Sequence, residues 1–188
     1  MPIDLNKKNR QTGIIEVICG CMFSGKTKEL IRRIKDSGIQ QQKIGVFKPS
    51  IDIRYHSDKI VSHDSNSVDA TPIQEGKRIV DHVDGLELVA IDEAQFFEHA
   101  LVEAVQKIAD QGIRVIVAGL DMDYRGIPFG PMPALLSIAN HVTQLHAICE
   151  RCGGEASFSY RKTRSDEQVL IGEKNEYEAR CISCFDYN

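Results

Sequence analysis

Short apolar runs alternate with helical patterns along most of the chain. Runs rich in β-branched residues predict buried strands over 14–19, 43–47, 86–91, 115–120 and 142–149. Apolar residues three and four positions apart predict helices from Lys26 to a stop at Ser37-Gly38, over 98–111 and over 131–140. This alternation predicts an α/β fold, in which helices cover both faces of a mostly parallel sheet.

Three stretches fall outside this alternation. The first residues are polar, which predicts a flexible leader over 1–12. Residues 50–72 are polar and weakly periodic, which predicts a long loop. Beyond about residue 145 the chain turns to short polar segments that carry cysteines. We therefore expect an α/β domain over 13–144 and a small cysteine-bearing domain over 145–188.

Composition and charge narrow the class of protein. The 188 residues are 42% apolar and 27% charged, and the net charge is −4, whereas a dedicated nucleic-acid binder is more often basic. No apolar run approaches the ~20 residues of a membrane span, and the start lacks the apolar core of a signal peptide. We expect a cytoplasmic protein with no nucleic acid and no membrane as partner. Its six cysteines are then thiols or metal ligands rather than disulfides.

The segment GCMFSGKT matches the phosphate-binding P-loop pattern in full, between a predicted strand and a predicted helix. Its glycines let successive backbone N–H groups face phosphates, and the helix adds the positive end of its dipole. Lys26 can reach the terminal phosphates, and the Thr27 hydroxyl can bind Mg²⁺. Met22 and Phe23 pack either on a substrate or in the core. The pattern predicts that ATP is bound by Gly20, Cys21, Met22, Phe23, Ser24, Gly25, Lys26 and Thr27.

The strand predicted over 86–91 runs directly into the acidic pair Asp92-Glu93. In a P-loop protein the first carboxylate helps to hold Mg²⁺, and the second can accept a proton from an attacking hydroxyl. A kinase uses such a pair, and so does a nucleic-acid-stimulated ATPase. The latter needs a second ATPase lobe and a basic track, for which this chain is too short and too acidic. A nucleotide-binding regulatory module without transfer stays open at this point.

Four cysteines form two pairs with metal-binding spacing. Cys149-x-x-Cys152 and Cys181-x-x-Cys184 are separated by 28 residues, which suits one tetrahedral Zn²⁺ with four thiolates. All four coordination positions are filled, so the pattern favours a structural site. A redox dithiol pair and an iron–sulfur cluster are the alternatives. Zinc ribbons bind nucleic acid in some proteins and cross-link the fold in others, and the acidic chain favours the second use.

Together these motifs resemble a known family. GCMFSGKT, KPSIDIRY, SHDS, IDEAQFF, AGLDMDYRGIPFG and the paired cysteines around VLIGEKNEY follow one another in the order found in type II thymidine kinases of bacterial kind, from about residue 13 to residue 185. The resemblance implies transfer of the γ-phosphoryl of ATP to the 5′-hydroxyl of thymidine. It also implies Mg²⁺, structural zinc, a RecA-like α/β domain and a homotetramer. The alternative function is a zinc-ribbon ATPase stimulated by nucleic acid.

The resemblance also implies roles for single residues. The expected catalytic base is Glu93. The metal is expected to lie near Asp92, Thr27 and Asp52, and the nucleotide near Arg54 and Gln95. The residues expected to line the thymine pocket are Met22, Phe96, Leu120, Tyr124 and Phe129. A lasso loop is expected to hold the base through main-chain hydrogen bonds of Val169, Leu170, Ile171, Gly172 and Glu173, with Tyr177 closing the sugar side. In this reading 13–144 is the ATP-binding domain and 145–188 the zinc-binding lasso domain.

The chain departs from the family pattern at a few positions. Glu173 stands where the lasso often has a second glycine, Ile182 follows the third cysteine in place of arginine, and Ser65 replaces a common glycine. Because main-chain contacts need no particular side chain, Glu173 bears on loop conformation and affinity more than on activity. The resemblance gives no role to His63 and Asp64. Arg161 is a candidate for closing on the donor phosphates.

Overall fold

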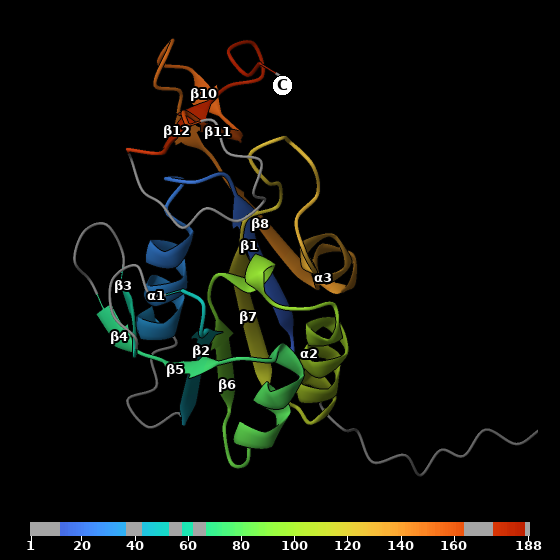
Figure 1. Cartoon of the computed structure of the whole chain (residues 1–188). Helices are drawn as coiled ribbons and strands as arrows, with labels where there is room; N and C mark the ends of the chain where they lie inside the picture. The colour runs from blue at the N-terminus through green and yellow to red at the C-terminus, as the bar shows by residue number, and fades with distance from the viewer. Residues whose placement is uncertain (1–11, 37–42, 53–57, 62–66, 164–174, 187–188) are drawn as a thin grey trace, which may run out of the picture.

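A six-stranded parallel sheet forms the centre of the protein, with strand order β5-β2-β6-β7-β1-β8. The structure is a computed structural model that describes residues 12–36, 43–52, 58–61, 67–163 and 175–186 (Figure 1). The sheet strands are β1 (Ile15–Gly20), β2 (Ile44–Pro49), β5 (Thr71–Ile73), β6 (Leu88–Ile91), β7 (Arg114–Gly119) and β8 (His141–Leu145). The predicted parallel α/β sheet is therefore confirmed.

Helices cover both faces of the sheet, as the sequence predicts. The elements are α1 (Lys26–Asp36), α2 (Ala100–Asp110), α3 (Met132–Ile138) and the 3-10 helices η1 (Gly76–His82) and η2 (Ala94–Phe96). Figure 1 shows α1 on one side of the sheet and α2 and α3 on the other. Leu30, Ile31 and Ile34 of α1 pack on the first face, whereas Leu101 and Val105 of α2 pack on the second. None of the described helices is long and apolar enough to cross a membrane.

Two predictions about elements are wrong. The polar stretch 50–72 is not one long loop, because β3 (Lys59–Val61) pairs antiparallel with β4 (Ser67–Asp69), and β5 pairs with the edge of the sheet beside β2. Each of these strands has only three residues, too few to show a period, and β5 contains Pro72, which strands accept at an edge. The strand expected over 142–149 is two strands, β8 and β9 (Ala147–Ile148), with different partners.

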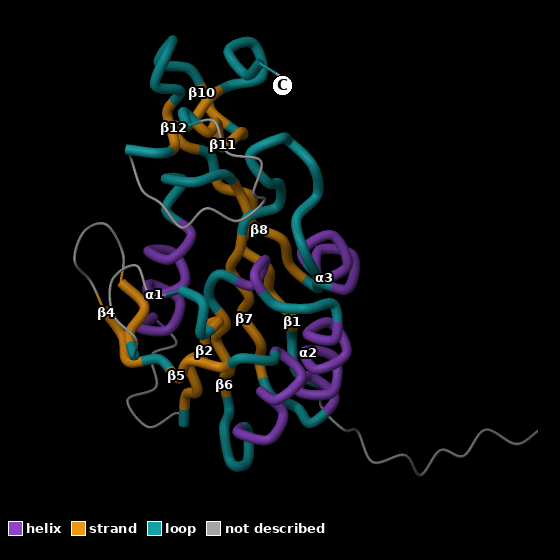
Figure 2. The backbone as a smooth tube through the Cα atoms, viewed as in Figure 1, coloured by secondary structure: helices purple, strands orange, loops and turns teal. Residues whose placement is uncertain are grey.

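Two antiparallel ribbons lie beyond the carboxyl ends of the sheet strands (Figure 2). One pairs β9 with β10 (Glu155–Ala156), and the other pairs β11 (Phe158–Arg161) with β12 (Tyr177–Arg180). They follow β8, which ends at Leu145, so they come after the predicted boundary. The division into domains at that boundary stays a prediction.

A buried acid cross-links four elements of the sheet layer. Glu16 on β1 accepts hydrogen bonds from Arg33 of α1 at 2.7 Å and Arg114 of β7 at 2.6 Å, and Arg33 also donates to Thr143 Oγ1 of β8 at 2.7 Å. Burial alone would raise the pKa of Glu16, but the hydrogen bonds and charges of Arg114 and Arg33 hold this pKa below its ordinary value. The ionised form is therefore the one that stabilises the fold.

The Glu16→Gln substitution is expected to lower the free energy of unfolding at pH 7 by about 1.5–3 kcal/mol, the usual worth of hydrogen bonds to a charged group. Because the pKa of Glu16 is lowered in the folded state, this contribution is present at neutral pH and is lost as the pH falls below the ordinary carboxyl range. Urea unfolding at pH 7 and pH 3.5 measures the gap between variant and wild type. The exposed Glu103→Gln change serves as control. An equal gap at both pH values would contradict the account.

Candidate active site and cysteine cluster

The P-loop joins the end of β1 to the start of α1, as the sequence predicts. Gly20 has φ +139°, and a Cβ there would lie 2.1 Å from the carbonyl oxygen of Leu145, at the end of the neighbouring strand. Gly25 has φ +89°, in the left-handed region that favours glycine. Only glycine therefore fits both ends of the loop.

Lys26 is buried inside this loop. Its Nζ donates to the carbonyl oxygen of Cys21 at 2.7 Å, and the Ser24 hydroxyl donates to the same oxygen at 2.8 Å. Burial lowers the pKa of Lys26, while the charges of Glu93 and Asp92 act in the opposite direction. The lysine therefore lies in the same electrostatic field as the acidic pair that follows β6.

The P-loop and the acidic pair meet through one hydrogen bond. The Thr27 hydroxyl donates to Asp92 Oδ2 at 2.9 Å, although 65 residues separate them. Adjacent oxygen ligands of an octahedral Mg²⁺, at bond lengths of about 2.1 Å, lie about 3 Å apart. The donating hydroxyl keeps its lone pairs for a cation, so the Thr27–Asp92 pair fits Mg²⁺. Asp52 is buried in the turn after β2, with its Oδ2 3.9 Å from Lys48 Nζ.

Glu93 has a strained backbone and a held side chain. Its φ of 52° and ψ of 39° are left-handed, which costs a non-glycine residue about 1–3 kcal/mol and is most often seen at functional sites. Gln95 Nε2 donates to Glu93 Oε2 at 2.6 Å, and Gln95 Oε1 accepts the backbone N–H of Leu120 at 2.9 Å. Gln95 is 2% exposed, so its amide is a fixed bridge between the end of β6 and the end of β7.

The residues expected in the thymine pocket form two groups. Phe96 and Phe129 pack edge to face, with ring centroids 5.8 Å apart. Tyr124 and Tyr177 are joined by Arg161, whose guanidinium carbon lies 3.6 Å from the Tyr124 ring centroid. Leu120 follows β7 and is partly buried, and Met22 is partly buried in the P-loop. The structure places Arg161 against these two tyrosines.

Several predicted residues lie outside the part of the chain that the structure describes. These are the leader over 1–11, Arg54, His63, Asp64, Ser65, Val169, Leu170, Ile171, Gly172 and Glu173. Ile182 is described and is exposed.

Strands β10 and β11 contact the P-loop, which sequence reasoning missed. The backbone N–H of Met22 donates to Ser159 Oγ at 2.9 Å, and the Cys21 thiol donates to the carbonyl oxygen of Ala156 at 3.3 Å. Cys21 also packs with Ala156, Ala179 and Cys149 in one small core. These contacts join residues more than 130 positions apart, and no local pattern marks them.

Asp121 is a further acidic residue that sequence reasoning left without a role. It follows β7, its charge acts on Lys26, and its buried Oδ1 has no hydrogen bond partner among the described residues. The only sequence signal was its place in the AGLDMDYRGIPFG segment.

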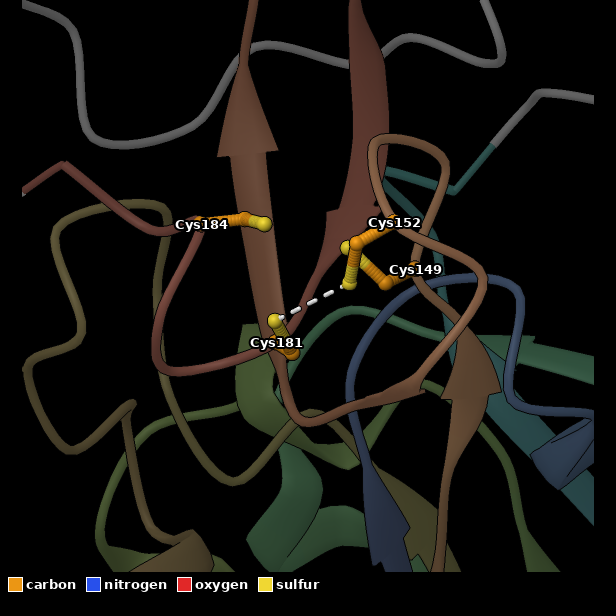
Figure 3. A group of neighbouring side chains, drawn as sticks. All are labelled: Cys149, Cys152, Cys181 and Cys184. Atoms are coloured by element: carbon orange, nitrogen blue, oxygen red, sulfur yellow. Dashed lines mark hydrogen bonds between the residues drawn. The ribbon is translucent and has the colours of Figure 1, made fainter.

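Four cysteine sulfurs gather between the two ribbons (Figure 3). The sulfurs of Cys149, Cys152, Cys181 and Cys184 all lie within 4.8 Å of one another, and those of Cys152 and Cys181 are 3.6 Å apart. Tetrahedral Zn²⁺ with bonds of about 2.3 Å places its sulfurs about 3.8 Å apart. The arrangement therefore fits a four-thiolate metal site.

The surroundings of the cluster favour a dication. Backbone N–H groups of Cys181, Cys152 and Arg151 lower the pKa of the Cys149 thiol to about 6. The neighbouring thiols of Cys181 and Cys152 raise the pKa of Cys184 to about 12. Four thiolates this close repel one another unless a cation lies between them, so the cluster could hold one metal ion.

Comparison with known proteins identifies the family. The family model described as thymidine kinase matches residues 13–185, which include the P-loop, the acidic pair and all four clustered cysteines. The chain belongs to the thymidine kinase family. The resemblance carried by the sequence motifs is thereby confirmed.

Relatives within the thymidine kinase family match almost end to end. The thymidine kinases of Bacteroides fragilis strain ATCC 25285 and Porphyromonas gingivalis strain W83 are each 52% identical, covering 95% and 92% of this chain and 90% and 85% of theirs. That of Rhodothermus sp. strain ITI 518 is 49% identical over 92% of this chain and 81% of its own. Among solved structures, the Legionella pneumophila ATPase DotB aligns at 16% identity with a TM-score of 0.42, covering 68% of this chain and 34% of that one.

The Gln95→Leu substitution tests the bridge between β6 and β7 in this family member. The variant leaves the partly buried Leu120 N–H without its acceptor, which is expected to cost about 1–3 kcal/mol of unfolding free energy. Gln106→Leu, on the exposed side of α2, is the matched control and should change stability by no more than about 0.5 kcal/mol. Urea unfolding measures both. Equal midpoints for Gln95→Leu and wild type would show that the bridge contributes nothing.

Proposed function

We propose that the protein transfers the γ-phosphoryl group of ATP to the 5′-hydroxyl of thymidine, giving dTMP and ADP in pyrimidine deoxynucleoside salvage. The observation that carries the proposal is the Thr27–Asp92 hydrogen bond in a chain of the thymidine kinase family, because it brings the phosphate loop to the strand end that carries Glu93. We also expect a cytoplasmic protein and, on the family resemblance alone, a homotetramer.

On the donor side, the backbone of the P-loop and the dipole of α1 bind the phosphates. Lys26 leaves the Cys21 carbonyl for the terminal phosphates, where its charge offsets the charge of the migrating group. Thr27 and Asp92 hold Mg²⁺, with Asp52 and Arg54 nearby, and the bound ion supplies charge neutralisation between the phosphates. The bond between Gln95 and Glu93 points to a role for Gln95 in orienting the base rather than in contacting ATP.

On the acceptor side, Glu93 accepts the proton of the 5′-hydroxyl as the oxygen attacks phosphorus. Gln95 donates to one carboxylate oxygen of Glu93 and so orients the carboxylate. Met22, Phe96, Leu120, Tyr124 and Phe129 line the thymine pocket, residues 169–173 hold the base through their main chain, and Tyr177 closes the sugar side. Positioning and charge neutralisation supply most of the rate, because phosphoryl transfer needs little covalent help.

The four cysteines hold structural Zn²⁺. A metal ion bound there would cross-link the chain after β12 to the chain between β9 and β10. All four ligand positions are taken by thiolates, so the ion leaves no open position for catalysis.

The function is tested by incubating the purified full chain with Mg·ATP and a panel of deoxynucleosides and ribonucleosides. Thymidine 5′-monophosphate and ADP should form in equal amounts, with no product from ribonucleosides. ATP loss that requires single-stranded nucleic acid and weakens with salt would support the ATPase alternative instead.

The matched variant in this assay is Glu93→Gln, which keeps the shape of the side chain and removes the base. Turnover should fall by roughly 10²–10⁴, the usual worth of a general base, while ATP binding is retained. The exposed Glu103→Gln change should leave turnover unaltered. Near-normal turnover of Glu93→Gln would remove Glu93 from its proposed role.

Metal removal tests the zinc assignment. Elemental analysis should find one zinc per chain, as expected for one four-thiolate site. Chelation, or the Cys152→Ser substitution, should lower the unfolding midpoint, because metal binding is coupled to folding. A metal-free chain with unchanged stability and thymidine binding would refute the structural role.

A further inference from the structure

Arg161 connects two tyrosines from distant parts of the chain. It is the last residue of β11 and is 5% exposed, and its guanidinium carbon lies 3.6 Å from the Tyr124 ring centroid. Its Nε and Nη2 both donate to the Tyr177 hydroxyl oxygen, at 3.1 Å and 2.7 Å. Arg161 and Tyr177 also face each other in the β11–β12 register. One buried guanidinium thus fixes both rings.

The two tyrosines belong to different sides of the site. Tyr124 follows β7, the strand between the P-loop strand and the strand that carries Glu93. The buried Asp123 holds its turn by accepting the backbone N–H groups of Arg125 and Ile127. Tyr177 begins β12, where the chain returns from residues 164–174. Arg161 therefore connects the sheet side of the site to the ribbon side.

The two hydrogen bonds hold the Tyr177 hydroxyl from one side. Nε and Nη2 lie on the same edge of the guanidinium, and both donate to the one phenolic oxygen. Both bonds have a charged donor, which makes them stronger than neutral hydrogen bonds. The side chain of Tyr177 is therefore held in one orientation at the start of β12.

Strand β11 carries a second buried polar residue, Ser159. Ser159, two positions earlier on the same face, accepts the backbone N–H of the P-loop residue Met22. Ser159 thus contacts the donor side and Arg161 the acceptor side. By contrast, Arg180 of β12 stacks on Tyr160 at 3.1 Å and pairs with Glu178, which packs the ribbon itself. Arg161 instead reaches out of the ribbon and contacts Tyr124, which follows β7.

We propose that Arg161 is a positioning residue that determines the affinity for the acceptor nucleoside: it holds the side chain of Tyr177 and the ring of Tyr124 in the wall of the nucleoside pocket. This inference rests on the proposed function and deepens it.

The test compares steady-state kinetics of the zinc-loaded full chain and its variants. Arg161→Met keeps a long apolar stem and removes the donors, Arg161→Lys keeps the charge, and Tyr177→Phe removes the hydroxyl. Arg125→Met is the matched control, because Arg125 lies over the same Tyr124 ring at 5.4 Å and no described contact joins it to Tyr177. KM is measured for thymidine and for ATP separately.

Arg161→Met should raise the KM for thymidine roughly 10- to 100-fold, the usual cost of losing a charge-assisted hydrogen bond. The KM for ATP and the thymidine KM of Arg125→Met should stay within about two-fold, the scatter of uncoupled sites. Arg161→Lys should restore part of the loss. In the Tyr177→Phe background, Arg161→Met should add little, because the two residues act as a unit.

An unchanged thymidine KM, an equal rise in both KM values, or full additivity with Tyr177→Phe would overturn the inference. If Arg161→Met does not fold, Arg161→Lys and Tyr177→Phe decide the same question. A wild-type chain that phosphorylates no thymidine would instead refute the proposed function.

Discussion

Parallel pairing of β7 with both β1 and β6 is the constraint on which the site depends. Because parallel strands end at the same edge of a sheet, the P-loop after β1 and the acidic pair after β6 come together there. The Thr27–Asp92 hydrogen bond of 2.9 Å is the direct result. The bridge from Gln95 to the backbone of Leu120 then fixes Glu93 against the middle strand. The P-loop and Glu93 are thus held together at one edge of the sheet.

The ribbons complete this edge from outside the sheet. Ser159 accepts a P-loop N–H, and Cys21 packs in one small core with the cluster residue Cys149. The cysteine cluster is therefore in contact with the phosphate loop. A metal ion bound there would hold the nucleotide loop and the nucleoside side of the site in one unit, and its loss would loosen both.

Much of this was predictable from the sequence, and the misses share a physical cause. Five of the six sheet strands and the three helices follow from apolar periodicity, because the elements are long enough to show it. Strands β3, β4 and β5 have three residues each, which is too few to show a period, and β5 also contains Pro72. Thr27, Asp92, Glu93 and the cysteines were found because they sit in local motifs. The partners of Gln95, Ser159 and Arg161 are set by strand order and ribbon register, which no local pattern encodes.

The central claim is that Glu93 receives the proton of the 5′-hydroxyl while Thr27 and Asp92 hold Mg²⁺ at the phosphates. A crystal structure of the full chain with thymidine, Mg²⁺ and a non-hydrolysable ATP analogue tests it most directly. The account predicts a Glu93 carboxylate oxygen about 2.6–3.2 Å from the thymidine 5′-oxygen, with that oxygen in line with the γ-phosphorus. A 5′-oxygen bonded to another residue, with Glu93 turned away from the nucleoside, would contradict it.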